Sequence, residues 1–402
     1  MDEQKVLELD EKSVQSVKQY PRKRGLFSVL ADESGRPFVA LVGPRGTGKT
    51  VLLRQLRSGR PASLYISADT LVPGDRLADV VRLFSERYRV TSFFIDEIHF
   101  LKHYAADLKE IYDFSNVSIW FSSSVALSLY STAWDLSRRV VRHILLPFSF
   151  REYLSFRFGL ELDPLALETV LEEEIPPDHL KTSYRFEEYL CGGLFPHTLE
   201  SGIKLQSFEN IVNKILTGDI PSLEPSLTMD DLGNISRTLA FVGNAAGDEV
   251  NYSSTSRNAG VTKYKAERYL ELLERSFVVR RVFPAGANVL KEPKVLLVPP
   301  YRLLYRPLEQ CVGQLREDFF ALAMDQHGLE FRYLKNTRGG KTPDFLLDLS
   351  GSATVVEIGG RRKGRSQFKG IDYRRKVVLY QAGESAVAGA DRVPLHCIGF
   401  PE

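Results

Sequence analysis

The chain has 402 residues, of which 43% are hydrophobic and 26% charged, a composition typical of a soluble protein with two to four packed domains. Lysine plus arginine (53) nearly equal aspartate plus glutamate (51), which excludes a uniformly polycationic nucleic-acid binder. Cys191, Cys311 and Cys397 lie far apart without CxxC spacing. This spacing argues against a zinc site and favours a reducing compartment.

Membrane and export signals are also missing from the sequence pattern. No apolar run reaches the roughly 18 residues that a membrane span needs. The first residues, Met-Asp-Glu-Gln-Lys, do not open a signal peptide. We therefore expect a cytoplasmic protein that does not contact a membrane.

The clearest motif is GPRGTGKT, Gly43 to Thr50, which fits the phosphate-binding pattern GxxxxGK[ST]. It follows the apolar strand predicted at 38–42 and precedes a helical pattern at 51–56, the context that this motif requires. Backbone N–H groups of such a loop surround a phosphate, and the helix N-terminus adds partial positive charge. The predicted nucleotide-contacting residues are Gly43, Pro44, Arg45, Gly46, Thr47, Gly48, Lys49, Thr50 and Val51.

The motif predicts ATP and Mg²⁺ as ligands. Lys49 would neutralise the β- and γ-phosphate oxygens, and Thr50 would coordinate Mg²⁺. A second apolar strand, within 91–99, ends in Asp96 and Glu97. Asp96 would hold Mg²⁺ through water and Glu97 would polarise the attacking water. His99, just beyond them, is more typical of a structural or hydrogen-bonding residue than of a catalytic one.

Two further features have candidate roles in ATP hydrolysis. The strand predicted at 117–121 ends in three serines, and we assign Ser122 as the residue that orients water beside the γ-phosphate, although ordinary turn chemistry is the alternative. Of the Arg138–Arg139 pair, Arg139 is the candidate for reaching a neighbouring subunit's γ-phosphate. That role would require a homo-oligomer, and a plain surface arginine is the equal alternative.

The order GPRxxGKT, DEIHxxxxY, LKEIYD, a serine-rich strand end and LSRR…LPFSFREYL resembles prokaryotic AAA+-type P-loop ATPases with a C-terminal domain of unknown function. The resemblance covers roughly residues 20–400, and the Gly-Gly segment within 186–196 is similar to an element of that family. It implies an α/β fold with an AAA+-type core, a helical segment, a winged helix and a restriction-endonuclease-like domain. The expected domains are 1–35, 36–150, 151–227, 228–300 and 301–402.

Residues 228–285 have the pattern of a winged helix, with helices followed by strands. The segment 253–260 predicts a helix that ends at a glycine, 261–275 a longer helix, and 277–283 the first wing strand. The longer helix carries Lys263, Lys265 and Arg268, which would contact phosphates or base edges if this is a recognition helix. Winged helices in ATPases also serve as packing modules, so both interpretations remain open.

The last hundred residues resemble a PD-(D/E)xK nuclease that has lost part of its site. Glu317 opens a predicted helix, Asp344 follows a proline, and Glu357 ends an apolar strand, so the three carboxylates are candidate Mg²⁺ ligands. The lysine expected two residues after the glutamate is Gly359, which can neither orient water nor screen charge. Lys341, Arg361 or Lys363 is a candidate substitute, although arginine is a poor one because it does not lose its proton. The basic run 359–376 also supplies candidate nucleic-acid contacts at Arg361, Arg362, Lys363 and Arg365.

Three functions fit these patterns. The first is an ATPase coupled to nucleic acid, with DNA favoured, through the winged helix and the basic run. The second is an ATP-dependent switch or scaffold whose partner is another protein. The third is an ATP-coupled, metal-dependent nuclease, which the missing lysine disfavours. We expect the nuclease shell to be retained for binding rather than cutting.

Overall fold

The structure is a computed structural model of the chain. It describes residues 2–33, 36–72, 74–126, 136–172, 174–245, 250–286, 292–334, 343–360, 368, 373, 375–382 and 392–401. The chain forms two compact units. The first contains residues 1–146, 217–226 and 275–277, and the second contains the remaining residues. The five domain ranges expected from the sequence stay a prediction.

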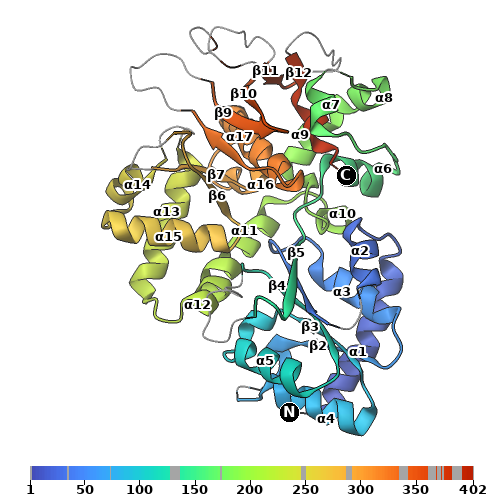
Figure 1. The fold of residues 1–402 in the computed structure, drawn as a ribbon. Helices are drawn as coiled ribbons and strands as arrows, with labels where there is room; N and C mark the ends of the chain where they lie inside the picture. The colour runs from blue at the N-terminus through green and yellow to red at the C-terminus, as the bar shows by residue number, and fades with distance from the viewer. Residues whose placement is uncertain are drawn as a thin grey trace. The chain divides into compact units, whose positions relative to one another are not determined.

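The first unit is built on a five-stranded, all-parallel sheet (Figure 1). Its strands are β1 Phe38–Val42, β2 Ser63–Ser67, β3 Ser92–Asp96, β4 Ser118–Ser123 and β5 Val140–Ile144, in the spatial order β2-β3-β4-β1-β5. All five residues of β1 are buried, as expected for a strand covered on both faces. Because the strands are parallel, their carboxyl ends meet at one edge of the sheet.

Helices cover both faces of this sheet. They are α1 Glu3–Ser16, α2 Leu26–Asp32, α3 Lys49–Ser58, α4 Leu77–Tyr88, α5 Tyr104–Phe114 and the short α12 Ile220–Leu223. Apolar residues of α2 and α3 pack with Leu41 and Trp120 on one face. Those of α4 and α5 pack with Phe93 and Phe121 on the other. Side chains therefore alternate between two apolar layers, and the strand ends carry the polar groups.

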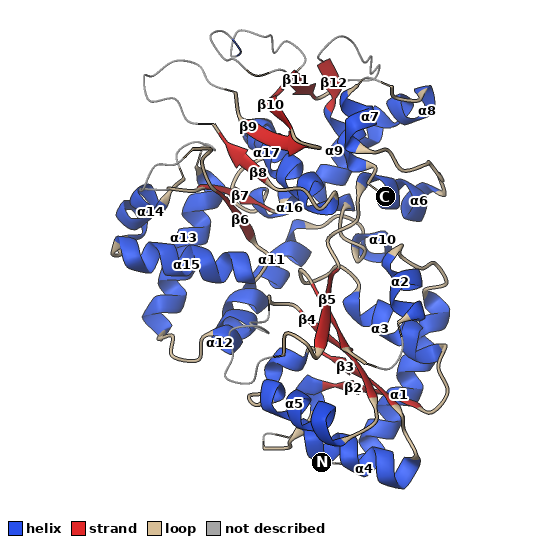
Figure 2. Cartoon of the chain, in the orientation of Figure 1, coloured by secondary structure: helices blue, strands red, loops and turns tan. Residues whose placement is uncertain are grey.

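The second unit begins with a helical region, followed by three further helices and a two-stranded sheet (Figure 2). The helical region comprises α6 Phe150–Phe158, α7 Leu167–Leu171, α8 Pro177–Leu180, α9 Phe186–Glu188, α10 Thr198–Ser201 and α11 Leu205–Lys214. After these come α13 Met229–Asn244, α14 Tyr252–Ala259, α15 Lys263–Arg275 and the antiparallel pair β6 Val279–Val282 and β7 Lys294–Leu297. Gly260 ends α14 at φ 68°, so this helix stops at a glycine as the sequence predicted.

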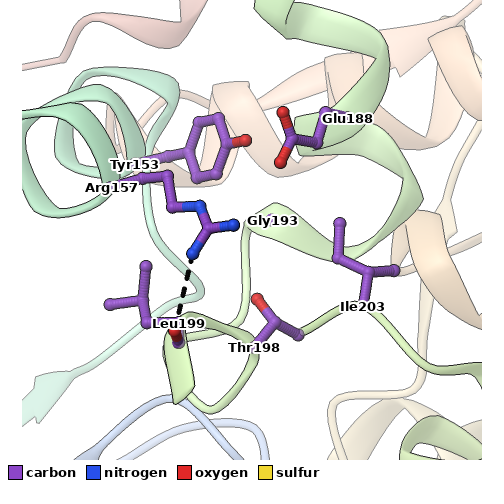
Figure 3. A pocket seen from close by; sticks show the side chains of 7 residues that line it. All are labelled: Tyr153, Arg157, Glu188, Gly193, Thr198, Leu199 and Ile203. Atoms are coloured by element: carbon purple, nitrogen blue, oxygen red, sulfur yellow. Dashed lines mark hydrogen bonds between the residues drawn. The ribbon is translucent and has the colours of Figure 1, made fainter. Parts of the chain in front are cut away.

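The Gly-Gly segment has a packing role in this unit. A Cβ on Gly192 would lie 2.8 Å from the ring of Phe208, and one on Gly193 would lie 2.5 Å from the ring of Tyr153. Gly193 and Tyr153 also line a small cavity of about 130 Å³, shown in Figure 3 with Glu188 and Arg157. The two glycines are therefore needed where the backbone approaches aromatic rings.

The rest of the second unit is a five-stranded mixed sheet with α17 Leu308–Gln326, preceded by the short α16 Pro299–Arg302. Its strands are β8 Phe331–Tyr333, β9 Phe345–Leu349, β10 Ser352–Gly359, β11 Arg375–Tyr380 and β12 Arg392–Pro394, in the order β12-β11-β10-β9-β8. β10, β11 and β12 are parallel to one another, and β8 and β9 are antiparallel to their neighbours. Both units combine helices and sheets, which confirms the α/β fold class.

A buried ion pair connects α16, α17 and β7. Asp318 is 0% exposed and accepts hydrogen bonds from Arg302 Nε at 2.5 Å and Nη2 at 2.9 Å. It also accepts one from the backbone N–H of Leu297 at 2.9 Å. Breaking such a pair leaves the second charge buried without compensation, which costs far more than the intact pair contributes.

We expect Asp318→Ala to lower the free energy of unfolding by about 3–5 kcal/mol, because Arg302 would stay buried without its carboxylate. Urea unfolding followed by circular dichroism measures this loss. The control is Glu309→Ala, at an exposed position on the same helix, which should change stability by about 0.5 kcal/mol or less. Equal effects of the two substitutions would contradict the account.

Candidate functional site

The phosphate-binding motif forms a loop between β1 and α3. Gly43, Gly46 and Gly48 have φ angles of 156°, 83° and 90°, a region that side chains rarely permit. A Cβ at Gly43 would lie 2.2 Å from the carbonyl oxygen of Leu145, so glycine is required there on two grounds. The loop ends at the N-terminus of α3, and a loop of this kind can direct its backbone N–H groups toward a bound anion.

Lys49 lies inside this loop. Its Nζ donates hydrogen bonds to the carbonyl oxygens of Gly43 and Pro44, both at 2.8 Å. Burial lowers the pKa of the ammonium, and the nearby carboxylates Glu97 and Asp96 oppose that shift. A buried cation held by two neutral carbonyls can exchange them for anionic phosphate oxygens, so the loop fits a nucleotide phosphate.

Asp96 ends β3 and is fixed from two sides. The hydroxyl of Tyr65 on β2 donates to Asp96 Oδ2 at 2.8 Å, and Ser122 Oγ on β4 donates to Asp96 Oδ1. Burial and the charge of Asp96 raise the pKa of Tyr65, so this phenol stays a donor. A fixed, buried carboxylate beside the phosphate loop fits a hard cation such as Mg²⁺, with Thr50 the predicted second ligand.

Glu97 follows Asp96 and has a left-handed backbone, with φ 53° and ψ 47°. Its N–H donates to Ser122 Oγ at 2.9 Å. Its carboxylate accepts hydrogen bonds from both the N–H and the Oγ of Ser124, each at 3.0 Å. A strained backbone at a fixed carboxylate is typical of functional sites. Ser122 thus orients Asp96 and the turn, while Ser124 touches Glu97; the sensor role assigned to Ser122 stays a prediction.

An acidic residue that the sequence motifs did not identify, Asp219, joins this site. It belongs to the short segment 217–226 of the first unit and is 0% exposed. Arg45 of the phosphate loop donates to it from Nε at 2.7 Å and from Nη2 at 2.5 Å. Burial alone would raise the pKa of Asp219, but the nearby His99 ring and the hydrogen bonds from Arg45 hold the pKa below its ordinary value. No local pattern around residue 219 announces this position.

Arg139 lies elsewhere in the first unit. Its guanidinium forms an ion pair with Asp113 at 3.0 Å and lies 5.5 Å from the ring centroid of Tyr112. Its side chain is 19% exposed. The role in a neighbouring subunit's site stays a prediction, and it would require Arg139 to leave Asp113.

The three basic candidates on α15 already carry acidic partners; Lys263 and Lys265 are exposed, and Arg268 is half-buried. Lys263 pairs with Glu292, Lys265 with Asp231 at 2.9 Å, and Arg268 with Glu271 at 3.2 Å. Phosphate contact at these positions would therefore replace ion pairs within the protein. The other nucleic-acid candidates, Arg361, Arg362, Lys363 and Arg365, and also Lys341, lie outside the described residues.

The nuclease-like carboxylates come together in the second unit. Glu317 lies on α17, Asp344 precedes β9, and Glu357 lies on β10; Asp344 Oδ2 accepts a hydrogen bond from the N–H of Ile358 at 2.6 Å. Burial, Glu317 and Glu357 raise the pKa of Asp344 to about 7, while Lys294 acts in the opposite direction.

Lys294, on β7, is a cation that sequence reasoning missed. Its ammonium is 2.7 Å from Glu317 Oε2, and its side chain is 5% exposed. No set of three or more His, Cys, Asp or Glu side chains in the described ranges is arranged to hold a metal ion. None of the helices described combines the length and apolar character needed to cross a bilayer.

Comparison with known proteins identifies two regions. Residues 35–154 match a family model described as an AAA domain, and residues 183–298 match one described as a domain of unknown function (DUF8612). The first match spans the phosphate loop and the strands that carry Asp96 and Glu97. Residues 35–154 therefore form an AAA-type, nucleotide-binding P-loop domain.

Proteins that match most of the chain have low sequence identity to it. The chain is 26% identical over 379 residues to the uncharacterized protein MJ1637 of Methanocaldococcus jannaschii, covering 84% of this chain and 78% of that protein. The Aeropyrum pernix ORC1 protein in complex with DNA matches at TM-score 0.32 and 16% identity, over 78% of this chain and 93% of that one. The Drosophila ORC bound to DNA matches at TM-score 0.30 and 13% identity, over 75% and 98%. Structural likeness this low does not bear on what this chain binds.

The raised pKa of Asp344 predicts a pH-dependent stability. Folded Asp344 keeps its proton up to about pH 7, whereas an unfolded aspartate releases it near pH 4. The contribution of protonated Asp344 to the free energy of unfolding is therefore full below about pH 4 and is lost as the pH rises through 7. Asp344→Asn should raise the free energy of unfolding by on the order of 1–3 kcal/mol at pH 8 and change it little at pH 4.

Urea unfolding at both pH values checks this expectation. Asp348→Asn, at an exposed position on β9, is the matched control and should show no such difference. If Asp344→Asn raises the free energy of unfolding equally at pH 4 and pH 8, the raised pKa of Asp344 is not the cause.

Proposed function

We propose that the protein binds ATP with Mg²⁺ and hydrolyses it to ADP and phosphate. The observation that carries this proposal is the meeting of Lys49, Asp96 and Glu97 at the carboxyl edge of one parallel sheet. Lys49 is held at the phosphate loop by two carbonyls, and both carboxylates are oriented by serines of β4 and its end. The match of residues 35–154 to an AAA domain supports the same activity.

Each residue has a separate task in this reaction. The loop N–H groups and Lys49 bind the phosphates and offset their charge. Thr50 and Asp96 would hold Mg²⁺, which neutralises charge on the β- and γ-phosphates. Glu97, fixed by Ser124, accepts a hydrogen bond from the attacking water and aligns it with the γ-phosphate. Binding and water activation are thus assigned to different side chains.

This division predicts different losses for two substitutions. Lys49→Ala should lower ATP affinity by at least about tenfold, because the phosphates lose their buried cation. Glu97→Gln should keep ATP affinity within about threefold of wild type and lower kcat by about 10²-fold or more. Titration with a fluorescent ATP analogue and phosphate release measure the two quantities. Unchanged nucleotide affinity in Lys49→Ala would contradict the phosphate-loop assignment.

We further propose that nucleotide turnover is coupled to nucleic acid, with duplex DNA favoured, through α15. The arrangement of α13, α14, α15 and the β6–β7 pair supports a winged-helix interpretation. The side chains of Lys263 and Lys265 are about half exposed, at 48% and 50%. Released counterions can offset the cost of breaking their ion pairs with Glu292 and Asp231.

We also propose that the nuclease-like part of the second unit, the sheet β8–β12 with α17, binds nucleic acid without cutting it. Gly359 stands where a catalytic lysine would be expected, and it is the last residue of β10. The lysine beside the carboxylates, Lys294, is paired with Glu317. This pairing supports a structural role for Lys294 rather than a catalytic one.

The nucleic-acid role predicts a salt-dependent affinity. The triple substitution Lys263→Ala, Lys265→Ala and Arg268→Ala should weaken duplex DNA binding by about tenfold or more at low salt. It should also reduce the slope of log K against log salt by about 0.9 per lost contact. Fluorescence anisotropy at several salt concentrations measures both values.

Lys181→Ala is the control, because Lys181 pairs with Asp178 at 2.8 Å on another helical segment. Its DNA affinity should match wild type. DNA affinity that ignores salt, or that the triple substitution leaves unchanged, would contradict the role of α15 and favour a protein partner.

A further inference from the structure

Asp219 occupies an unusual place along the chain. It ends the turn of π-helix Ile215–Asp219 and directly precedes α12. Residues 217–226 belong to the first unit, whereas the chain on both sides of them belongs to the second. A fully buried carboxylate needs compensation, and here the compensation comes from the nucleotide site itself.

Three side chains of that site contact the Asp219 carboxylate. Arg45 donates two hydrogen bonds in a bidentate arrangement, at 2.7 and 2.5 Å. Ser124 Oγ, whose single hydroxyl proton Asp219 shares with Glu97, lies 3.2 Å from Oδ2, and His99 Nε2 lies 3.5 Å from Oδ1. These partners come from the phosphate loop, the end of β4 and the turn after β3.

The same three side chains also contact Glu97. Ser124 donates to Glu97 Oε2 at 3.0 Å, and His99 Nδ1 lies 3.3 Å from that oxygen. Arg45 Nη1 lies 3.7 Å from Glu97 Oε1, a longer distance than its two bonds to Asp219. Asp219 and Glu97 are therefore two carboxylates that share one set of partners, and the arginine is bound more closely to Asp219.

We propose that Asp219 is a positioning residue for ATP hydrolysis, which holds Arg45 in a bidentate pair and so leaves Glu97 available to the attacking water. The proposal rests on the ATPase function proposed above. Without the Asp219 carboxylate, the Arg45 guanidinium has Glu97 as its nearest anionic partner. A direct Arg45–Glu97 pair would lower the basicity of Glu97 and occupy its oxygens.

The test is Asp219→Asn, which keeps the shape of the side chain and removes its charge. We expect kcat to fall by about tenfold or more, with the KM for ATP and the affinity for ADP within about twofold of wild type. Circular dichroism at the assay temperature verifies that the variant is folded. A general loss of structure would change nucleotide affinity together with kcat, so the split between kcat and KM separates positioning from stability.

The matched control is Asp107→Asn. Asp107 is 2% exposed and pairs with Arg76 at 2.6 Å in the same unit, among α4 and α5. This variant therefore loses an ion pair between a buried aspartate and an exposed arginine, and the pair does not involve the three partners of Glu97. Its kcat should stay within about twofold of wild type.

Two results would overturn the proposal: a kcat in Asp219→Asn within about twofold of wild type, or parallel losses of kcat and ADP affinity. Absence of turnover in the wild type would instead contradict the proposed hydrolysis. It would also overturn a positioning role in hydrolysis. A wild type that turns over ATP beside an unimpaired Asp219→Asn would overturn the inference about Asp219 alone.

Discussion

Each unit of this protein contains a fully buried aspartate whose charge an arginine compensates. In the first unit Arg45 binds Asp219, and in the second Arg302 binds Asp318. A carboxylate moved out of water is costly unless hydrogen bonds and an opposite charge replace its hydration. At Asp318, hydrogen bonds from Arg302 and from a backbone N–H of β7 replace the lost hydration, and the result is a structural link between α16, α17 and β7. At Asp219 the compensating arginine belongs to the phosphate loop, so the same physical requirement ties a distant segment to the nucleotide site.

The sheet edge of the first unit concentrates polar groups because its interior is apolar on both faces. Strands β1, β3 and β4 deliver the phosphate loop, Asp96 with Glu97, and the serines to one edge. Ser122, Ser123 and Ser124 contact Asp96, His99 and Glu97 respectively. The three serines thus each contact a different residue of the segment 96–99. The left-handed backbone of Glu97 is held by this contact set rather than by local preference.

In the second unit, the candidate nucleic-acid contacts that the structure describes are already paired with acidic side chains. Lys263, Lys265 and Arg268 each have an acidic partner, and Asp231 additionally accepts a hydrogen bond from Tyr269 at 2.6 Å. Exposed pairs of this kind contribute little stability, so a phosphate can replace them at modest cost. Binding through α15 would then be sensitive to salt.

The sequence allowed us to predict the parts of the site that are encoded by residues adjacent in the chain. The phosphate loop and the acids at the end of β3 were predictable because strand, turn and helix are contiguous there. Asp219 was not, since it is 174 residues from Arg45 and no pattern marks a residue that acts through tertiary contact. Lys294 was missed for the same reason: a lysine search confined to Lys341 and the basic run after β10 does not reach β7. Which serine contacts Asp96 and which contacts Glu97 depends on the strand register and on the turn geometry at Glu97.

The central claim is that these separate elements assemble one Mg²⁺-dependent ATP-hydrolysing site. The most direct measurement is steady-state phosphate release from ATP by the purified wild-type protein, with excess Mg²⁺ and with a chelator. The account predicts turnover that depends on Mg²⁺ and saturates with ATP. Absence of turnover at saturating ATP and Mg²⁺, or a rate that the chelator leaves unchanged, would contradict it.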